Sequence, residues 1–153
     1  MARQPDDAQV VRMGLRALVL GNERYRRSVA ESLGLGITEL RTLMQLHNAG
    51  PHTPRQIADF LGFSTGSTTA ILDRLEGGGF IVRTPNPSDR RSLLINLTPS
   101  AEVSMADAAG RAEDHITAAL GAYSAEEIAR LARAMTTVGR ALSTADPLPS
   151  GRF

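Results

Sequence analysis

The sequence contains no cysteine and no tryptophan, and only 4% of its 153 residues are aromatic. Without cysteine there is no disulfide, no thiol nucleophile and no thiolate metal ligand, so thiol-based redox sensing is excluded. A metal site would need the three histidines together with carboxylates. His47 and His52 straddle a predicted helix end and His115 lies far away in sequence. We therefore expect no metal.

Long apolar runs are absent as well, so no segment is expected to span a bilayer. Residues 1–7 lack the apolar stretch of a secretory signal, which predicts a cytoplasmic protein with no membrane partner. Nucleotide-binding and catalytic motifs are missing too. Gly34-Leu35-Gly36 fails as a dinucleotide fingerprint, because Glu39 stands at the third glycine position. We expect no enzyme activity and no cofactor.

Lysine does not occur, so all 17 basic residues are arginine, and the formal net charge is only +1. This balance argues against a protein that coats nucleic acid indiscriminately. Any positive field must be local. Arg24, Arg26 and Arg27 cluster on the first predicted helix, where we interpret them as a solvated face in preference to phosphate contacts.

Residues 52–75 carry the signals of two short helices joined by a tight turn. Thr53, Pro54 and Gln56 form a helix start with a capping box, and Gly62 is a typical helix end. Ser64 then caps a second helix. Its apolar positions follow at i, i+3, i+4 and i+7, and these are Thr68, Ile71, Leu72 and Leu75.

A hairpin is predicted next in the chain. Residues 80–83 and 92–97 are β-rich runs, and the segment 84–91 between them is turn-rich and basic. His52 and Thr53 are expected to add a short third strand. Helix, turn, helix and hairpin together predict a winged helix-turn-helix that binds DNA.

Three stretches of this unit closely resemble the MarR family of bacterial transcription regulators. They are Ile57-Ala58-Asp59-Phe60-Leu61-Gly62, then Asp73-Arg74-Leu75-Glu76 with Gly79-Phe80, then Asp89-Arg90-Arg91 with Leu97-Thr98. The resemblance implies a homodimer on palindromic operator DNA, more often a repressor than an activator, that a small-molecule effector releases. Two positions depart from the family pattern: Ala70 replaces a frequent basic residue, and Ala101 replaces a usual glycine.

The second helix of the pair is the expected recognition helix. Its outward positions and first turn should contact DNA, through Ser64, Thr65, Gly66, Ser67, Thr69 and Ala70. Arg90 and Arg91 are expected to enter a minor groove from the wing. Asp89 should fix the wing by pairing with Arg91 or another arginine. Arg55 is either a phosphate clamp or an ordinary surface charge.

The predicted fold is mainly α with a small β wing: one domain over 1–153, with a winged helix-turn-helix at 38–98. Long helices at 6–33 and 99–143 flank that unit. They are expected to form a homodimer, although they could instead enlarge a monomeric core. Thr38 should cap the second helix and Ser124 the last one. Residues 144–153 are expected to be disordered.

Inward positions of the flanking helices follow from apolar spacing. On the first helix we expect Val10, Val11, Leu15, Leu18, Val29 and Leu33 to point mostly inward. The last helix has an apolar stripe at Ile128, Leu131, Met135, Val138 and Leu142.

The effector site is the least determined feature of the sequence. Met44 and His47 are weak candidates to line an effector pocket, and His47 could equally be a core-edge residue. An alternative function is a protein-interaction module that kept the fold and lost specific DNA binding. The small side chains at Gly66 and Ala70 favour that alternative.

Overall fold

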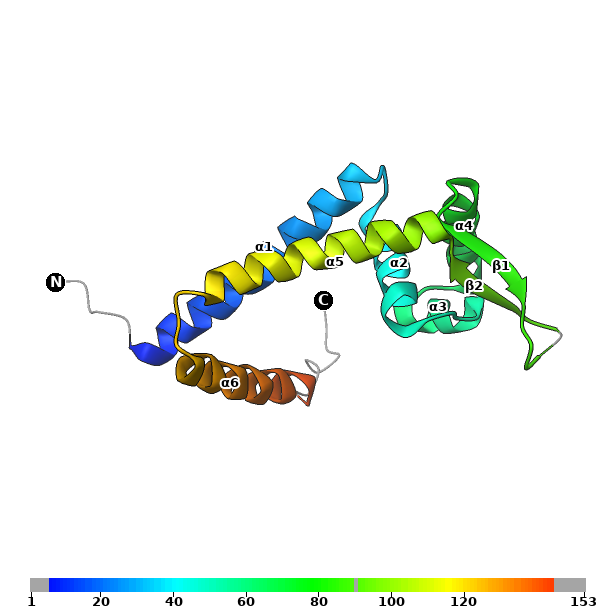
Figure 1. Ribbon diagram of the computed structural model, residues 1–153. Helices are drawn as coiled ribbons and strands as arrows, with labels where there is room; N and C mark the ends of the chain where they lie inside the picture. The colour runs from blue at the N-terminus through cyan, green and yellow to red at the C-terminus, as the bar shows by residue number, and fades with distance from the viewer. Residues whose placement is uncertain (1–5, 90, 145–153) are drawn as a thin grey trace. The chain divides into compact units, whose positions relative to one another are not determined.

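Six helices and one two-stranded hairpin make up residues 6–89 and 91–144, the part of the chain that the computed structural model describes (Figure 1). In order they are α1 Asp7–Ser32, α2 Ile37–Ala49, α3 Pro54–Leu61, α4 Thr65–Gly77, β1 Ile81–Pro85, β2 Leu93–Leu97, α5 Pro99–Leu120 and α6 Ala125–Ser143. The chain divides into two compact units, residues 1–109 and 110–153, and the division falls within α5. The mainly α fold with a small β wing is confirmed.

Helix ends in the first unit follow the predicted local chemistry. The Asp6 carboxylate accepts the N–H of Gln9 at the start of α1. Thr53 and Gln56 form the reciprocal capping box of α3, and Gly62 ends that helix in the left-handed conformation at φ 70°. Ser64 caps α4 through the N–H of Ser67. Each end satisfies backbone groups that a helix leaves unpaired.

The predicted cap of α2 is wrong. Thr38 lies inside the helix, and Gly36 is the N-cap residue, whose N–H donates to the Glu39 carboxylate at 2.7 Å. The reason is that Glu39 reaches back three residues to the chain entering the helix, as Gln56 does in α3. Thr38 instead uses its carbonyl to accept the Thr42 hydroxyl.

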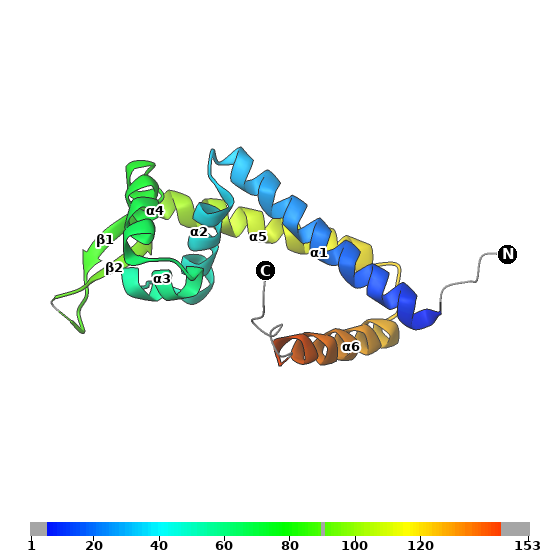
Figure 2. The same ribbon diagram turned by 180° about the vertical axis from the view of Figure 1, so that it is seen from behind.

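The wing is an antiparallel hairpin that projects away from α2, α3 and α4 in both views (Figures 1 and 2). Its strands begin one residue later than predicted, and β1 runs on to Pro85, with Arg83 opposite Ile95. The expected third strand is a single bridge, in which His52 and Ile95 exchange both backbone hydrogen bonds at 3.2 and 2.8 Å. The bridge fixes the base of the wing to the loop before α3.

The hydrophobic core lies within the first unit and draws on every element from α1 to α5. The buried apolar cluster consists of Ala30, Leu40, Leu43, Leu46, Ile57, Leu61, Ile71, Leu72, Leu75, Ile81, Ile95 and Met105. Burial of each large member contributes roughly 1.5–3 kcal/mol, so this cluster dominates the stability of the unit. None of the described helices combines the length and apolar character needed to cross a membrane.

The predicted inward face of α1 is wrong for its N-terminal half. Val10, Val11 and Leu18 remain more than half exposed, and Leu15 is only half-buried. Towards the C-terminal end of α1, Val29 and Leu33 pack against the core as expected. Apolar spacing identifies a face that avoids water, but the described residues of the first unit do not cover the first turns of α1.

The second unit has a well-formed helix but no interior of its own. Ser124 and Glu127 form the predicted capping box of α6. None of the described residues 110–144 is buried, and Leu131, Met135 and Leu142 of the predicted stripe are exposed. The predicted disordered tail, apart from Thr144, lies outside the described residues.

The left-handed end of α3 gives a test with an internal control. Neither Gly62 nor Gly66 has a neighbour within 4 Å of an added Cβ, but only Gly62 has a positive φ. We expect Gly62→Ala to lower the free energy of unfolding by about 1–2 kcal/mol. Gly66→Ala, on the exposed face of helix α4, should raise it by about 0.5–1 kcal/mol. Urea denaturation followed by circular dichroism measures both, and equal effects would contradict the assignment.

Candidate nucleic-acid interface

Helix α4 separates a buried face from an exposed one. Thr68, Ile71, Leu72 and Leu75 are between 0 and 5% exposed, as the spacing predicts. The positions of α4 expected to contact DNA are all exposed, and they are Thr65, Gly66, Ser67, Thr69 and Ala70. Asp73 is exposed as well. The N-terminal half of α4 therefore presents five predicted contact residues between Thr65 and Ala70, interrupted by the buried Thr68.

The hydroxyl groups on this face are not equally free to donate. Ser64 donates to the Ser67 Oγ at 3.1 Å, and Thr69 donates to the Thr65 carbonyl at 2.9 Å. Ser64 therefore acts as a cap, and Thr69 offers only its methyl group and lone pairs. The hydroxyl protons of Thr65 and Ser67 have no acceptor among the described residues. These two are the side chains on the face that are available to donate to an anion.

The first turn of α4 also leaves backbone donors free. The first bond of the i to i−4 series runs from the Thr68 N–H to the Ser64 carbonyl, and the Ser67 N–H is taken by the Ser64 side chain. Helix geometry leaves the N–H groups of Thr65 and Gly66 without an internal acceptor. Since Gly66 has no side chain, a large anion can approach this end closely.

The tip of the wing is held by hydrogen bonds from its own turn residues. The Asn86 side-chain amide donates to the Ser92 hydroxyl at 2.8 Å, and the Ser88 N–H donates to the Asn86 side-chain oxygen. Asp89 accepts the backbone N–H of Arg91 at 3.0 Å and forms no ion pair with any described residue. The pairing with the Arg91 guanidinium, one of the predicted alternatives, does not form. Pairing with Arg90 lies outside the described residues, so the structural role of Asp89 stays a prediction.

The arginines predicted to contact DNA occupy separate elements. Arg91 is exposed at the wing, and Arg55 is exposed in the first turn of α3. Arg90 lies outside the described residues. On α1, Arg24 and Arg27 are exposed, but the Nε of Arg26 is buried and has no described partner. The predicted solvated face is therefore wrong for Arg26, which lines a hollow of about 640 Å³ with Arg27 and Arg41.

Arg83 joins the wing to the recognition helix, a role that the sequence analysis missed. Its guanidinium, on β1, lies 2.6 Å from the Asp73 carboxylate and 3.0 Å from the Glu76 carboxylate. The two acids are one turn apart on α4, so a single arginine bridges them. Spacing along α4 shows that the acids share a face, but the partner on β1 comes from the fold.

Arg74 joins α4 to α2 on another side. Its Nε lies 2.6 Å from the carboxylate of Glu39, whose side chain is 13% exposed. Burial alone would raise the pKa of Glu39. The hydrogen bonds from Arg74 and from the Gly36 N–H, with the charge of Arg74, outweigh burial and hold that pKa below its ordinary value of 4.5.

The two weak effector candidates lie in different environments. Met44 is half-buried and packs against the hydrophobic core. The imidazole Nδ1 of His47 lies 2.7 Å from a carboxylate oxygen of Glu102 on α5. The two candidates therefore do not share one site, and Glu102 is a partner that the sequence analysis did not name.

Residues 35–93, which include α2, α3, α4 and most of the hairpin, match the sequence model of the MarR family. The winged helix-turn-helix segment of the chain is therefore similar to that of the MarR family. The YcgE protein of Bacillus subtilis, described as an uncharacterized HTH-type transcriptional regulator, is 41% identical over 71 residues. That match covers 46% of this chain and 46% of YcgE, so the chain spans about half the length of this relative.

Solved structures with the same fold extend the likeness beyond the MarR segment. RV1404 of Mycobacterium tuberculosis has a TM-score of 0.74 at 28% identity, covering 92% of this chain and 97% of RV1404. FabT of Streptococcus pneumoniae, solved in complex with DNA, has a TM-score of 0.68 at 22% identity, covering 88% of this chain and 97% of FabT. The flanking helices therefore belong to the fold as well as the winged helix.

The Glu39–Arg74 pair predicts a pH-dependent contribution to stability. Because the pKa of Glu39 is lower in the folded state, its ionised carboxylate stabilises the fold above about pH 4.5. That contribution to the free energy of unfolding is lost as the pH falls further and the carboxylate becomes protonated. Glu39→Gln should lower the free energy of unfolding by about 1 kcal/mol at neutral pH. Urea titrations at neutral pH and near pH 4 should show the difference from wild type shrinking. Glu113→Gln, at an exposed position, is the control, and an equal difference at both pH values would exclude the carboxylate charge as the cause.

Proposed function

We propose that the protein is a transcriptional regulator that binds double-stranded operator DNA as a homodimer. The observation that carries the proposal is the exposed face of α4, whose first turn has two free N–H groups and two free hydroxyls. Such donors suit phosphate oxygens at the edge of a major groove. FabT, which has a similar fold, was solved with DNA, so this fold is compatible with DNA binding.

The recognition helix would contact DNA through short side chains. Thr65 and Ser67 would donate to phosphates, and Gly66 would allow close approach. Thr69 would present a methyl group and a lone pair, which suit a thymine methyl or a base amino group. Ser64 would act indirectly, by capping the helix. Ala70 offers only a methyl group, so we expect the helix to supply base preference and little charge.

The wing would supply the charge. Arg91 and Arg90 are proposed to enter an adjacent minor groove, where narrow A·T tracts concentrate negative potential. The Asp89 carboxylate supports this placement, because it accepts the backbone N–H of Arg91 at 3.0 Å. Arg55, exposed at the start of α3, is proposed as a phosphate contact. Arg83 would reduce the repulsion between the DNA backbone and the carboxylates of Asp73 and Glu76, because its positive charge offsets part of their two negative charges.

The homodimer is proposed from the apolar surfaces of the flanking helices. Val10, Val11 and Leu18 of α1 are more than half exposed, and α6 exposes its stripe at Leu131 and Met135. Exposed apolar faces on helices at both ends of a chain are typical of subunit interfaces. Two recognition helices related by a two-fold axis would match a palindromic operator.

The regulatory direction is also part of the proposal. We propose a repressor in the cytoplasm that a small-molecule effector releases from its operator. Without cysteine, any release must come from a bound molecule or partner and not from thiol oxidation.

A protein-interaction module without specific DNA binding is the alternative. The small side chains of Gly66 and Ala70 favour it, because the exposed stretch of α4 from Thr65 to Ala70 carries no arginine or glutamine that could read a base edge with two hydrogen bonds. A gel shift on the DNA flanking the protein's own gene, repeated at several salt concentrations, separates the two functions.

Removing the wing charge should weaken binding of every DNA sequence. Arg91→Ala should cost about 1–3 kcal/mol per half-site. It should also reduce the slope of log affinity against log salt by about 1 per half-site, because fewer counterions are released. The measurement is a binding titration on matched and scrambled sites at several salt concentrations. Arg111→Ala, which removes the same charge from an exposed position on α5, should bind like wild type.

Thr69→Ala should act differently from Arg91→Ala. It removes a base-edge contact and no charge, so base preference at one position should change while the salt slope stays constant. Selection of preferred sites from a randomised pool measures that preference. If neither Thr69→Ala nor Arg91→Ala differs from wild type in any of these titrations, the winged helix is not the DNA-binding surface.

The dimer proposal predicts a strong effect from the α6 stripe. Leu131→Gln with Met135→Gln should raise the dimer dissociation constant at least about a hundredfold, since four large apolar side chains per dimer would be lost. Sedimentation velocity at micromolar concentration measures this. Arg133→Gln, on the opposite face of the helix, is the control and should leave the dimer intact. A wild-type chain that sediments as a monomer would refute the proposal.

A further inference from the structure

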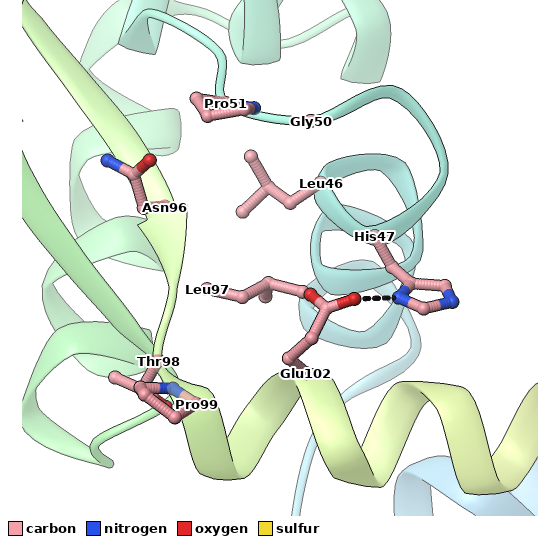
Figure 3. Close-up of a pocket in the computed structure, with 9 residues that line it drawn as sticks. All are labelled: Leu46, His47, Gly50, Pro51, Asn96, Leu97, Thr98, Pro99 and Glu102. Carbon is pink, nitrogen blue, oxygen red and sulfur yellow. Dashed lines mark hydrogen bonds and ion pairs between the residues drawn. The ribbon is translucent and has the colours of Figure 1, made fainter.

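A pocket of about 380 Å³ opens beside the base of the wing (Figure 3). Its walls come from the end of α2, the loop that follows, the end of β2 and the first turn of α5. Leu46, Leu97 and the rings of Pro51 and Pro99 give it an apolar surface. The volume lies at the lower end of the range for small-molecule sites, which is roughly 300–1,000 Å³.

The polar side of the pocket is a histidine and a carboxylate. His47 Nδ1 lies 2.7 Å from one oxygen of Glu102, and Figure 3 shows the other oxygen directed toward Leu97. That second oxygen has no hydrogen-bond partner among the described residues. The pocket thus holds a carboxylate oxygen that can still accept a hydrogen bond.

The charge of the pocket favours a cation. Among the residues that line it, Glu102 carries the only formal negative charge, and no arginine is present. The C-terminus of α2 and the N-terminus of α5 both border it, and their half-charges have opposite signs. These two contributions oppose each other, so the full charge of Glu102 decides the sign.

A metal ion is not the occupant that the chemistry suggests. The described residues contain no group of three or more potential metal ligands, and this pocket provides one imidazole and one carboxylate. A hydrated ion would also make no contact with the apolar walls of the pocket. An organic molecule with a flat apolar body satisfies both parts of the surface.

We propose that this pocket binds a small organic cation, an amidinium or ammonium attached to a flat apolar body. The cationic group donates to the free oxygen of Glu102, and the body packs against Leu46, Leu97 and Pro99. At roughly 30 Å³ per water-sized group, the volume holds about a dozen non-hydrogen atoms. Glu102 is partly exposed, so we expect modest affinity with clear selectivity for charge.

The site is placed to affect DNA binding, a consequence that rests on the proposed function. The occupant would touch β2 of the wing, the end of α2 and the start of α5 together. The same strand is held by the His52–Ile95 bridge beside the pocket. A ligand that prefers one arrangement of these three elements shifts the wing, and the affinity for DNA changes with it.

Three probes of one shape test the binding without DNA. Benzamidine is a cation, benzamide is its neutral analogue and benzoate is an anion. Calorimetry on the intact chain near pH 8 should show benzamidine binding at least about tenfold more tightly than benzamide, with no binding of benzoate. The tenfold ratio is the one expected for a charge-assisted hydrogen bond. Backbone amide NMR shifts should move at Gly50, Leu97 and Glu102.

Two variants of equal charge identify the carboxylate. Glu102→Gln should bind benzamidine and benzamide equally, whereas Glu113→Gln, exposed on α5 and away from the pocket, should keep the wild-type ratio. Equal binding of the three probes by wild type would overturn the proposal. So would an unchanged ratio in Glu102→Gln, or amide shifts confined to other helices.

A DNA titration in saturating benzamidine separates this inference from the proposed function. A changed affinity in wild type and an unchanged one in Glu102→Gln supports the regulatory consequence. If benzamidine binds and the DNA affinity is unaltered, the regulatory consequence is overturned but the binding site itself is still supported. If the chain binds no DNA at all, the proposed function fails, and the calorimetry still decides whether the site exists.

Discussion

The burial of one face of α4 is the constraint on which the rest of the structure depends. Leu72 and Leu75 are at most 1% exposed, so the rotation of the helix about its own axis is fixed by the core. The polar N-terminal half is thereby turned to solvent. Two charged contacts then hold the helix from different sides, Arg74 to Glu39 on α2 and Arg83 to Asp73 on β1. Surface pairs contribute little free energy each, but they restrict how α4 can tilt against α2 and the wing.

What the sequence predicted correctly is local chemistry. The caps at Thr53, Ser64 and Ser124 each depend on a residue three positions along, so a short stretch contains all the information. The stripe of α4 is also local, since helical spacing alone brings its members to one face. The Thr38 error belongs here too. Glu39 could have been recognised as the capping partner of Gly36, because it stands where Gln56 stands relative to Thr53.

What the sequence could not predict is which distant residues meet. Glu39 and Arg74 are 35 positions apart, His47 and Glu102 are 55 apart, and the Tyr25 hydroxyl donates to the Ala108 carbonyl 83 positions away. Each contact depends on the packing of whole helices. Asp89 shows a subtler limit. Its neighbour Arg91 offers a guanidinium and a backbone N–H, and the tight turn brings the N–H to the carboxylate at 3.0 Å.

On the flanking helices, a position that helical spacing predicts to face inward is not always buried in the structure. Helical spacing on α6 predicts a stripe that avoids water, and the described part of the second unit buries none of it. A helix of 19 residues without a buried face gains little from packing, and in proteins most helical stability comes from the packing of an apolar face. A packing surface for its apolar stripe would therefore stabilise the helix. In the proposed homodimer a second copy would supply that surface, and α6 would be more stable together with its partner. Association and folding of the C-terminal region would then be one equilibrium, which depends on protein concentration.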